Sequence, residues 1–291
     1  MKRKSQLRII PLLLGAALVL FAAGCGAEQA VSLGPVGDTT KTTTPSTTTR
    51  GPVTLALTVW LARSDGLVPV QRAHSLTKAV ATAAIEELLA GPTAEERASG
   101  ISSAIPAGTK LLGISLHDGV ATIDLTSEYA TGGGALSMQD RLGQVVYTLT
   151  EFPTIKKVLF HLDGAPVHVF SSEGIVLDHA VSRSDYVNLL PAITVTEPTR
   201  GERITSGVTV AGEANVFEAN VTIAVLNSHG KVIGKTVTTA SCGTGCRGTF
   251  SAQVAFTVAT EQPGTIVVHD DDAAGFGTPP HIVRIPVTLA P

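Results

Sequence analysis

The sequence is poor in aromatic and charged residues: Phe, Trp and Tyr make up 4% of it, and Asp, Glu, Lys and Arg make up 15%. So little charge argues against long solvated helices, and the abundant small and β-branched residues favour a β-rich fold. Only three cysteines are present, Cys25, Cys242 and Cys246. Cys242 and Cys246 alone cannot complete a structural zinc site, and no pair of histidines stands at ligand spacing near them. The chain has 291 residues, of which 44% are hydrophobic, enough to form the hydrophobic cores of two domains.

Motifs of enzyme chemistry are also missing. The sequence has no GxSxG nucleophile elbow and no HExxH metal motif. The glycine-rich segment TGGGALS, residues 131–137, lacks the lysine of a phosphate-binding loop. We therefore expect a protein that is not an enzyme, with no catalytic residues, no cofactor and no bound metal.

The basic residues are unevenly distributed along the chain. Without its first 24 residues, which hold four basic and no acidic side chains, the chain has 17 basic and 24 acidic residues, a net charge of −7. An acidic chain lacks the positive surface that neutralises phosphates. We therefore expect no nucleic-acid partner.

The N-terminus has the pattern of an export signal: a basic start, an apolar run from Ile9 to Ala23, and small residues before Cys25. The run is shorter than the roughly 20 residues that a transmembrane helix needs. Ala22, Ala23, Gly24 and Cys25 resemble the lipobox of bacterial lipoproteins, with Ala22 where leucine is most common. The resemblance implies that residues 1–24 are removed and that acyl chains such as palmitate are attached at Cys25. The chain would then be anchored at the extracytoplasmic face of the cell membrane. The alternative is an ordinary secretory signal with an unmodified cysteine.

Residues 25–52 are dominated by threonine and have almost nothing apolar to bury, as in TTKTTTPSTTTR at positions 39–50. This composition predicts a disordered tether.

Ordered patterns begin at residue 53. VTLALTVWLA predicts a buried strand, and an apolar stripe at helical spacing predicts a helix that Gly91 and Pro92 end. Thr93 and Glu96 have the spacing of a capping box for a further short turn. We therefore predict that the four nearby carboxylates are helix surface or helix N-terminal residues and not an acid/base pair: Glu86, Glu87, Glu95 and Glu96.

Two strands are predicted next, at 109–116 and 120–125, with a tight turn at Asp118–Gly119. A second helix, capped by Ser137 and ended by Pro153, leads to the strand KKVLFHL. The order of elements predicts an α+β domain at residues 53–190, a small βαββαβ sheet with two helices on one face.

Three segments carry a family resemblance: ELLAGPTAEE, SAIPAGTKLLGISLHDGVATIDLTSEY and RLGQVVYTLTEFPTIKKVLFHLDG. They resemble the GerMN domain of sporulation and spore germination proteins and of envelope lipoproteins, over about residues 53–190. The resemblance implies a fold akin to the ring-building motifs of secretion-system proteins. It also implies action through assembly, and it offers no catalytic residues.

Helical signals end near Pro191. About seven short alternating segments in the last 100 residues predict an all-β sandwich at 191–291. The segments AGEANVFEANV, NSHGKVI and GTFSAQVAF are similar to the immunoglobulin-like domain that accompanies GerMN in spore germination proteins.

A few residues remain as candidates for chemistry. In an exported protein, Cys242 and Cys246 are expected to form a disulfide. The run Asp270–Asp272 lacks the alternation and the final glutamate of a calcium loop, so a solvated loop is the simpler interpretation. His161 and His168 flank a turn and are expected to have structural or surface roles.

The sequence thus predicts a lipid-anchored, non-enzymatic protein that binds other envelope proteins or assembles with copies of itself. One alternative is a binder of cell-wall glycan such as peptidoglycan, although few aromatic residues are available to stack on sugars. A wall hydrolase using Asp124, Glu128 and Asp163 is a further alternative.

Overall fold

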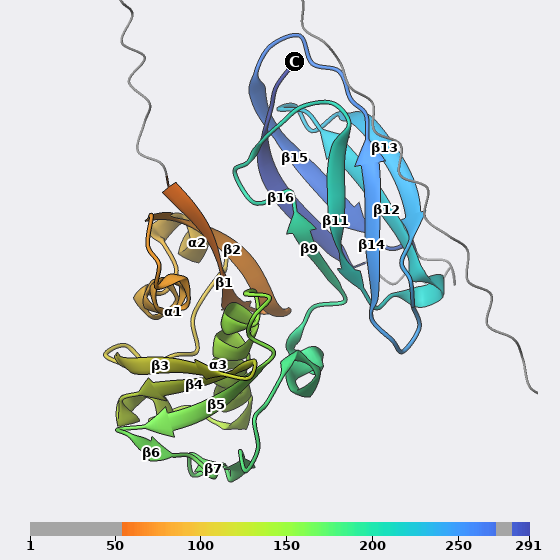
Figure 1. Cartoon of the computed structure of the whole chain (residues 1–291). Coiled ribbons are helices and arrows are strands. Elements are labelled where there is room, and N and C mark those ends of the chain that lie inside the picture. The colour runs from red at the N-terminus through yellow and green to blue at the C-terminus, as the bar shows by residue number, and fades with distance from the viewer. Residues whose placement is uncertain (1–53, 272–280) are drawn as a thin grey trace, which may run out of the picture. The chain divides into compact units, whose positions relative to one another are not determined.

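The computed structural model describes residues 54–271 and 281–291 (Figure 1). The predicted signal peptide, Cys25, the predicted tether and Asp272 lie outside the described residues. Within the described ranges, no helix combines the length and the apolar character needed to cross a membrane.

The first domain begins with a β-hairpin. Strand β1 (Thr54–Arg63) pairs antiparallel with β2 (Gly66–Ser75) along its whole length. The sequence analysis predicted β1 but not β2. Asp65 and Gly66 mark the turn between them, where Gly66 has a φ of +133° that a side chain disfavours.

Three α-helices, a 3-10 helix and a four-stranded sheet follow. The elements after the hairpin are α1 (Val80–Ala90), α2 (Ala94–Ala98), β3 (Leu111–His117), β4 (Val120–Leu125), the 3-10 helix η1 (Ser127–Ala130), α3 (Ala135–Leu149), β5 (Lys157–Leu162) and β6 (Ala165–Pro166). The sheet has the order β3-β4-β5-β6, with β4 and β5 parallel (Figure 1). The expected α+β class is confirmed. The predicted order of elements is present with β2 and α2 added, and β1 pairs with β2 rather than with this sheet.

Local chemistry explains where most of these elements begin and end. Gly91 ends α1 with a φ of +76°, and Thr93 and Glu96 form the predicted capping box at the start of α2. Asp118 and Gly119, both at positive φ, make the tight turn between β3 and β4.

The start of α3 differs from the prediction. The helix begins at Ala135 with Gly134 as its N-cap and no side-chain cap, not at Ser137. The buried side chain of Arg141 explains this difference. Its guanidinium donates to the carbonyls of Tyr129 and Thr131 at 2.8 Å and of Gly132 at 2.6 Å, which holds the glycine-rich segment at the helix start.

The core of the first domain consists of one large cluster and a small one formed by Leu57, Ala83 and Ala84. On β4, alternate residues are fully buried and face the helices: Ala121, Ile123 and Leu125. They belong to the same cluster as buried residues of β1, α1, α3 and β5, among them Leu61, Ile85, Leu88, Leu142, Val145 and Phe160.

The first domain closes with a small hairpin, β7 (Val169–Phe170) and β8 (Ile175–Val176), and the 3-10 helix η2 (Arg183–Leu189). Gly143 on α3 lets η2 approach closely, because a Cβ there would lie 2.6 Å from Leu189 Cδ1. The guanidinium of Arg183 lies 4.9 Å from the ring centre of Tyr147 and 5.5 Å from that of Trp60. The segment up to Leu189 therefore packs as part of the first domain.

The second domain is the expected β-sandwich. Its elements are β9 (Ile193–Glu197), β10 (Arg203–Ile204), β11 (Val208–Ala214), the 3-10 helix η3 (Phe217–Ala219), β12 (Asn220–Leu226), β13 (Val232–Thr239), β14 (Gly248–Val254), β15 (Gln262–His269) and β16 (Ile282–Leu289). One sheet has the order β10-β16-β15-β12-β13 and the other β14-β11-β9. Their facing sides bury residues such as Val210, Val221, Ile223, Phe250, Ile266 and Leu289.

Candidate functional site

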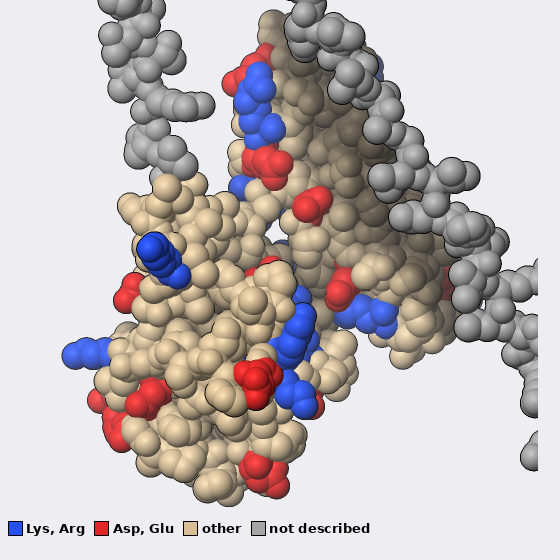
Figure 2. All heavy atoms as spheres, in the orientation of Figure 1, with Lys and Arg blue, Asp and Glu red and all other residues tan. Residues whose placement is uncertain are grey.

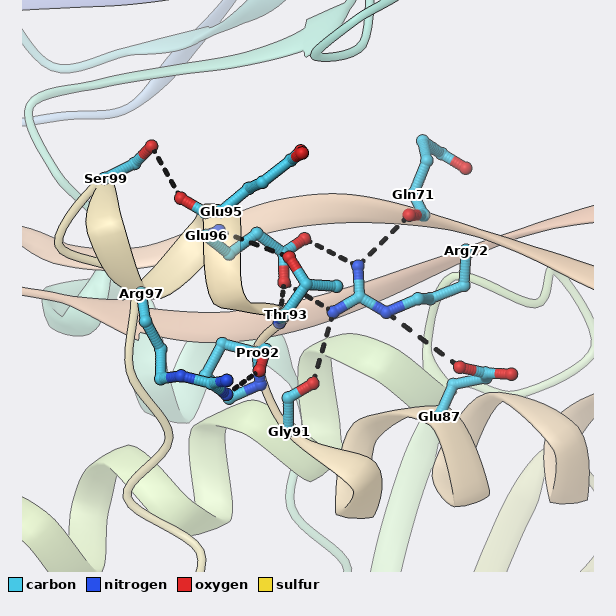
Figure 3. Close-up of polar contacts among 10 residues, drawn as sticks. All are labelled: Gln71, Arg72, Glu87, Gly91, Pro92, Thr93, Glu95, Glu96, Arg97 and Ser99. Atoms are coloured by element: carbon cyan, nitrogen blue, oxygen red, sulfur yellow. Dashed lines mark hydrogen bonds and ion pairs between the residues drawn. The ribbon is translucent and has the colours of Figure 1, made fainter.

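Two of the four carboxylates around the Gly91–Pro92 break, Glu87 and Glu96, lie beside one largely buried cation, Arg72 on β2 (Figure 3). Arg72 Nη1 lies 2.6 Å from Glu96 Oε1, and Nη2 lies 2.7 Å from Glu96 Oε2. Both side chains are only 11% exposed. This paired geometry fixes α2 against the hairpin.

The same glutamate also completes the helix cap. The backbone N–H of Thr93 donates to Glu96 Oε2 at 2.8 Å, and the N–H of Glu96 donates to Thr93 Oγ1 at 3.2 Å. Burial tends to raise the pKa of the Glu96 carboxyl, but the hydrogen bonds from Arg72 and Thr93 and the charge of Arg72 together hold that pKa below its usual value. Glu96 therefore stays ionised and is a structural anion.

The remaining carboxylates of the cluster do not form an acid/base pair. Glu87 Oε2 lies 3.9 Å from Arg72 Nε, while Glu86 and Glu95 are exposed to solvent. Arg72 Nη2 also donates to the carbonyl of Gly91 at 3.3 Å. The cluster thus joins β2, α1 and α2, as predicted for surface and capping residues, and provides no proton donor.

The carboxylates considered for hydrolysis are also engaged or solvated. Asp124 Oδ1 accepts a hydrogen bond from the backbone N–H of Gly164 at 3.0 Å, and Asp163 is exposed at the turn. Glu128 is exposed, and a hydrogen bond with Thr126 lowers its pKa. A general acid needs the opposite shift. These three residues therefore stabilise or border turns, and they are not arranged like the carboxylate pair of a glycosidase.

The histidines and acids considered as metal ligands do not converge. Among residues 54–271 and 281–291, no three His, Cys, Asp or Glu side chains are arranged to hold a metal ion. His161 is half-buried on β5, and His168 is exposed. Asp270 is buried, and its Oδ2 lies 2.9 Å from Nδ1 of His281, so this acid links the ends of β15 and β16.

Cys242 and Cys246 form a disulfide with their Cα atoms 5.8 Å apart, in the loop between β13 and β14. Both cysteines are half-buried. The bond closes a loop of five residues and therefore restrains only its immediate surroundings.

The outer strand of the four-stranded sheet is suited to binding another chain. β3 is the outer strand of its sheet, with β4 as its only strand partner among the described elements (Figure 1). Leu112 and Leu116 on this strand are 52% and 50% exposed. An outer strand with exposed leucines presents unpaired backbone donors and acceptors beside an apolar surface. The apolar alternation of LLGISLH indicated a strand, but nothing local in it indicated an outer position.

Charge on the surface gives no sign of a nucleic-acid interface. On the face shown in Figure 2, basic side chains lie near acidic ones and form no continuous basic patch.

Family models match both domains. A model described as Germane, "Sporulation and spore germination", matches residues 37–168, and a model described as Gmad2, "Immunoglobulin-like domain of bacterial spore germination", matches residues 192–276. No curated protein matches the chain.

Several solved structures are similar. The first GerMN domain of the sporulation protein GerM from Bacillus subtilis is 24% identical, with 45% of this chain and 99% of that one covered and a TM-score of 0.41. The tandem GerMN domains of the same protein are 15% identical, with 82% and 61% covered and a TM-score of 0.42. A putative lipoprotein from Clostridium perfringens is 20% identical, with 47% and 92% covered and a TM-score of 0.35.

Proposed function

Because this chain consists of a GerMN domain followed by the immunoglobulin-like domain of bacterial spore germination, we propose that it is a non-enzymatic protein of the cell envelope that acts by binding other proteins. Its setting would be sporulation, germination or the regulation of the envelope. The lipobox-like residues before Cys25 support an anchor in the outer face of the membrane. The two folded domains would then act outside the cytoplasm.

The observation that carries the proposal is the outer strand β3. Its free edge can accept one more strand through backbone hydrogen bonds, which supply affinity with little dependence on sequence. Leu112 and Leu116, both half exposed, add an apolar contact for the side chains of the added strand. We expect the partner to be another extracytoplasmic protein that offers an extended segment.

The disposition of the carboxylates supports a role without catalysis. Glu96 is ionised in a buried ion pair, and Asp124 accepts a backbone hydrogen bond. Such groups hold the fold together and are not positioned to transfer protons.

Glycan binding receives less support. Sugar sites usually present flat aromatic faces to solvent. In the described parts of the chain, the tryptophan and the three tyrosines are at most 4% exposed. Phe217 is the one aromatic side chain there that is more than half exposed.

The proposal is tested with the full-length lipoprotein isolated from solubilised membranes. We expect the wild-type chain to retain an envelope partner and Leu116→Lys to lose it, because a charge on the apolar edge opposes strand addition. Leu136→Lys is the matched control, since Leu136 is 71% exposed at the start of α3 in the same domain. Equal recovery of the partner by both variants would count against the β3 edge. Recovery of no envelope partner by the wild-type chain, with strictly monomeric chain in sedimentation, would count against the proposed function itself.

A further inference from the structure

The second domain displays one aromatic ring to solvent. Phe217 in η3 is 52% exposed, whereas the other phenylalanines of this domain within the described residues, Phe250 and Phe256, are 4% and 5% exposed. A phenylalanine that is half exposed forgoes much of the free energy that full burial in its own domain would give. Its position therefore needs another explanation.

The backbone that carries this ring is held in an unfavourable conformation. Glu218 has φ +54° and ψ +13°, and Ala219 has φ +58°. Two consecutive residues with side chains in the left-handed region are uncommon, because the Cβ atom approaches the backbone there. Such conformations persist only where the surroundings impose them, and they concentrate at functional sites.

The disulfide loop imposes this conformation through hydrogen bonds. The N–H of Thr244 donates to the carbonyl of Val216 at 2.9 Å, and the N–H of Glu218 donates back to Thr244 Oγ1 at 3.1 Å. The N–H of Gly245 donates to Asn215 Oδ1 at 3.0 Å. Three bonds therefore fasten the loop to both sides of Phe217.

Close packing adds to these hydrogen bonds. Gly243 lies so near to Ala219 that a Cβ on the glycine would be 2.5 Å from the backbone nitrogen of Ala219. The N–H of Ala240 donates to the carbonyl of Ala219 at 2.8 Å. The Cys242–Cys246 bond closes the loop that makes these contacts (Figure 1 shows β13 and β14 on either side of it).

We propose that Phe217 is a rigid anchor that inserts into an apolar pocket of a partner protein, and that a basic side chain at the rim of this pocket pairs with Glu218. A ring held in place before binding loses little freedom on binding. Aromatic side chains of this kind provide much of the affinity of protein interfaces. This proposal rests on the protein-binding function proposed above. Because the surface lies in the other domain from the β3 edge, either surface can fail its test without the other.

Chemistry favours a protein over a lipid or a sugar. The exposed carboxylate of Glu218 next to the ring is repelled by an anionic lipid surface and attracted by a lysine or arginine. A sugar site usually offers further flat aromatic surface. The described residues of this domain expose no second aromatic ring.

The experiment places the photoreactive amino acid p-benzoylphenylalanine at position 217 of the full-length chain in living cells. Val237 is the matched control position, since it is exposed to 57% on β13 in the same domain. We expect position 217, and not position 237, to form an adduct with one protein that mass spectrometry identifies. That purified protein should bind the purified chain about 30-fold more weakly when Phe217→Ser is introduced, the loss typical of an aromatic hot spot.

Charge and specificity are tested with the same purified pair. Glu218→Lys should weaken binding about 10-fold at low salt and less at high salt, while Val237→Ser should leave it unchanged. The proposal is overturned if position 217 gives no adduct above position 237, or only an adduct with a second copy of this chain. It is also overturned if the wild-type chain without its lipid binds phosphatidylglycerol vesicles or peptidoglycan and Phe217→Ser abolishes that binding.

Discussion

Arg72 and Glu96 form a two-point ion pair, with Nη1–Oε1 and Nη2–Oε2 distances of 2.6 and 2.7 Å, between residues 24 positions apart in the sequence. It connects the β1–β2 hairpin to α2, and Glu96 simultaneously caps that helix through Thr93. This carboxylate, which the sequence predicted as a capping residue, therefore stabilises the fold, and its removal should lower stability.

Substituting Glu96→Gln should lower the free energy of unfolding by about 2 kcal/mol, because Arg72 keeps its largely buried charge and loses the nearer of its two carboxylates. Chemical denaturation at neutral pH measures the change. Glu95→Gln in the same helix is the control and should change stability by less than about 0.5 kcal/mol, since Glu95 is exposed. Equal effects of the two substitutions would contradict the role given to the ion pair.

The contribution of Glu96 should depend on pH in a defined direction. Its pKa in the folded protein lies below the ordinary value of 4.5. The stabilisation is therefore complete above pH 4.5 and is lost as the pH falls through the lower, folded-state pKa. The difference in unfolding free energy between wild type and Glu96→Gln should be constant near neutral pH and shrink in acid. If this difference in unfolding free energy grew on acidification, the pKa of Glu96 would be raised in the folded protein and not lowered.

Removing the disulfide should act locally. The double substitution Cys242→Ser with Cys246→Ser should lower the stability by less than about 3 kcal/mol, because the closed loop is short. Hydrogen exchange should accelerate at the amides of Glu218 and Thr244, whose hydrogen bonds join this loop to the turn that carries Phe217. Unchanged exchange at these two amides would mean that the loop does not hold the turn.

The 3-10 helix η2 should contribute to the stability of the first domain. A fragment of residues 53–190 should unfold cooperatively, whereas a fragment ending at 181 should be less stable by about 3 kcal/mol or more, because it loses the buried ring of Tyr186. It also loses Arg183, which lies over the rings of Tyr147 and Trp60. Thermal unfolding of the two fragments measures the difference, and equal stability would place the domain boundary before η2.

The sequence predicts those features of the structure that are determined by residues lying close together in the chain. The stop at Gly91, the cap formed by Thr93 and Glu96, and the Asp118–Gly119 turn follow from residues within a few positions of one another, and the structure contains all three. The sandwich follows from repeated alternation between turns. In these cases the chemistry that shapes the chain is visible in a short window.

The elements that were missed depend on distant contacts. β2 contains Pro69 and several polar residues, so its composition is that of a weak strand, and pairing with β1 determines its conformation. The Asp65–Gly66 pair was the available signal for this hairpin. The early start of α3 depends on Arg141 binding the preceding carbonyls, and the outer position of β3 depends on the order of the whole sheet.

The most direct test of the account is a photocrosslink from the β3 edge in living cells, with p-benzoylphenylalanine at position 116 and, as the control, at position 136. The account predicts an adduct with an envelope protein, identified by mass spectrometry, at position 116 and none at position 136. Absence of any protein adduct at position 116, in cells where the chain is produced and anchored, would contradict it.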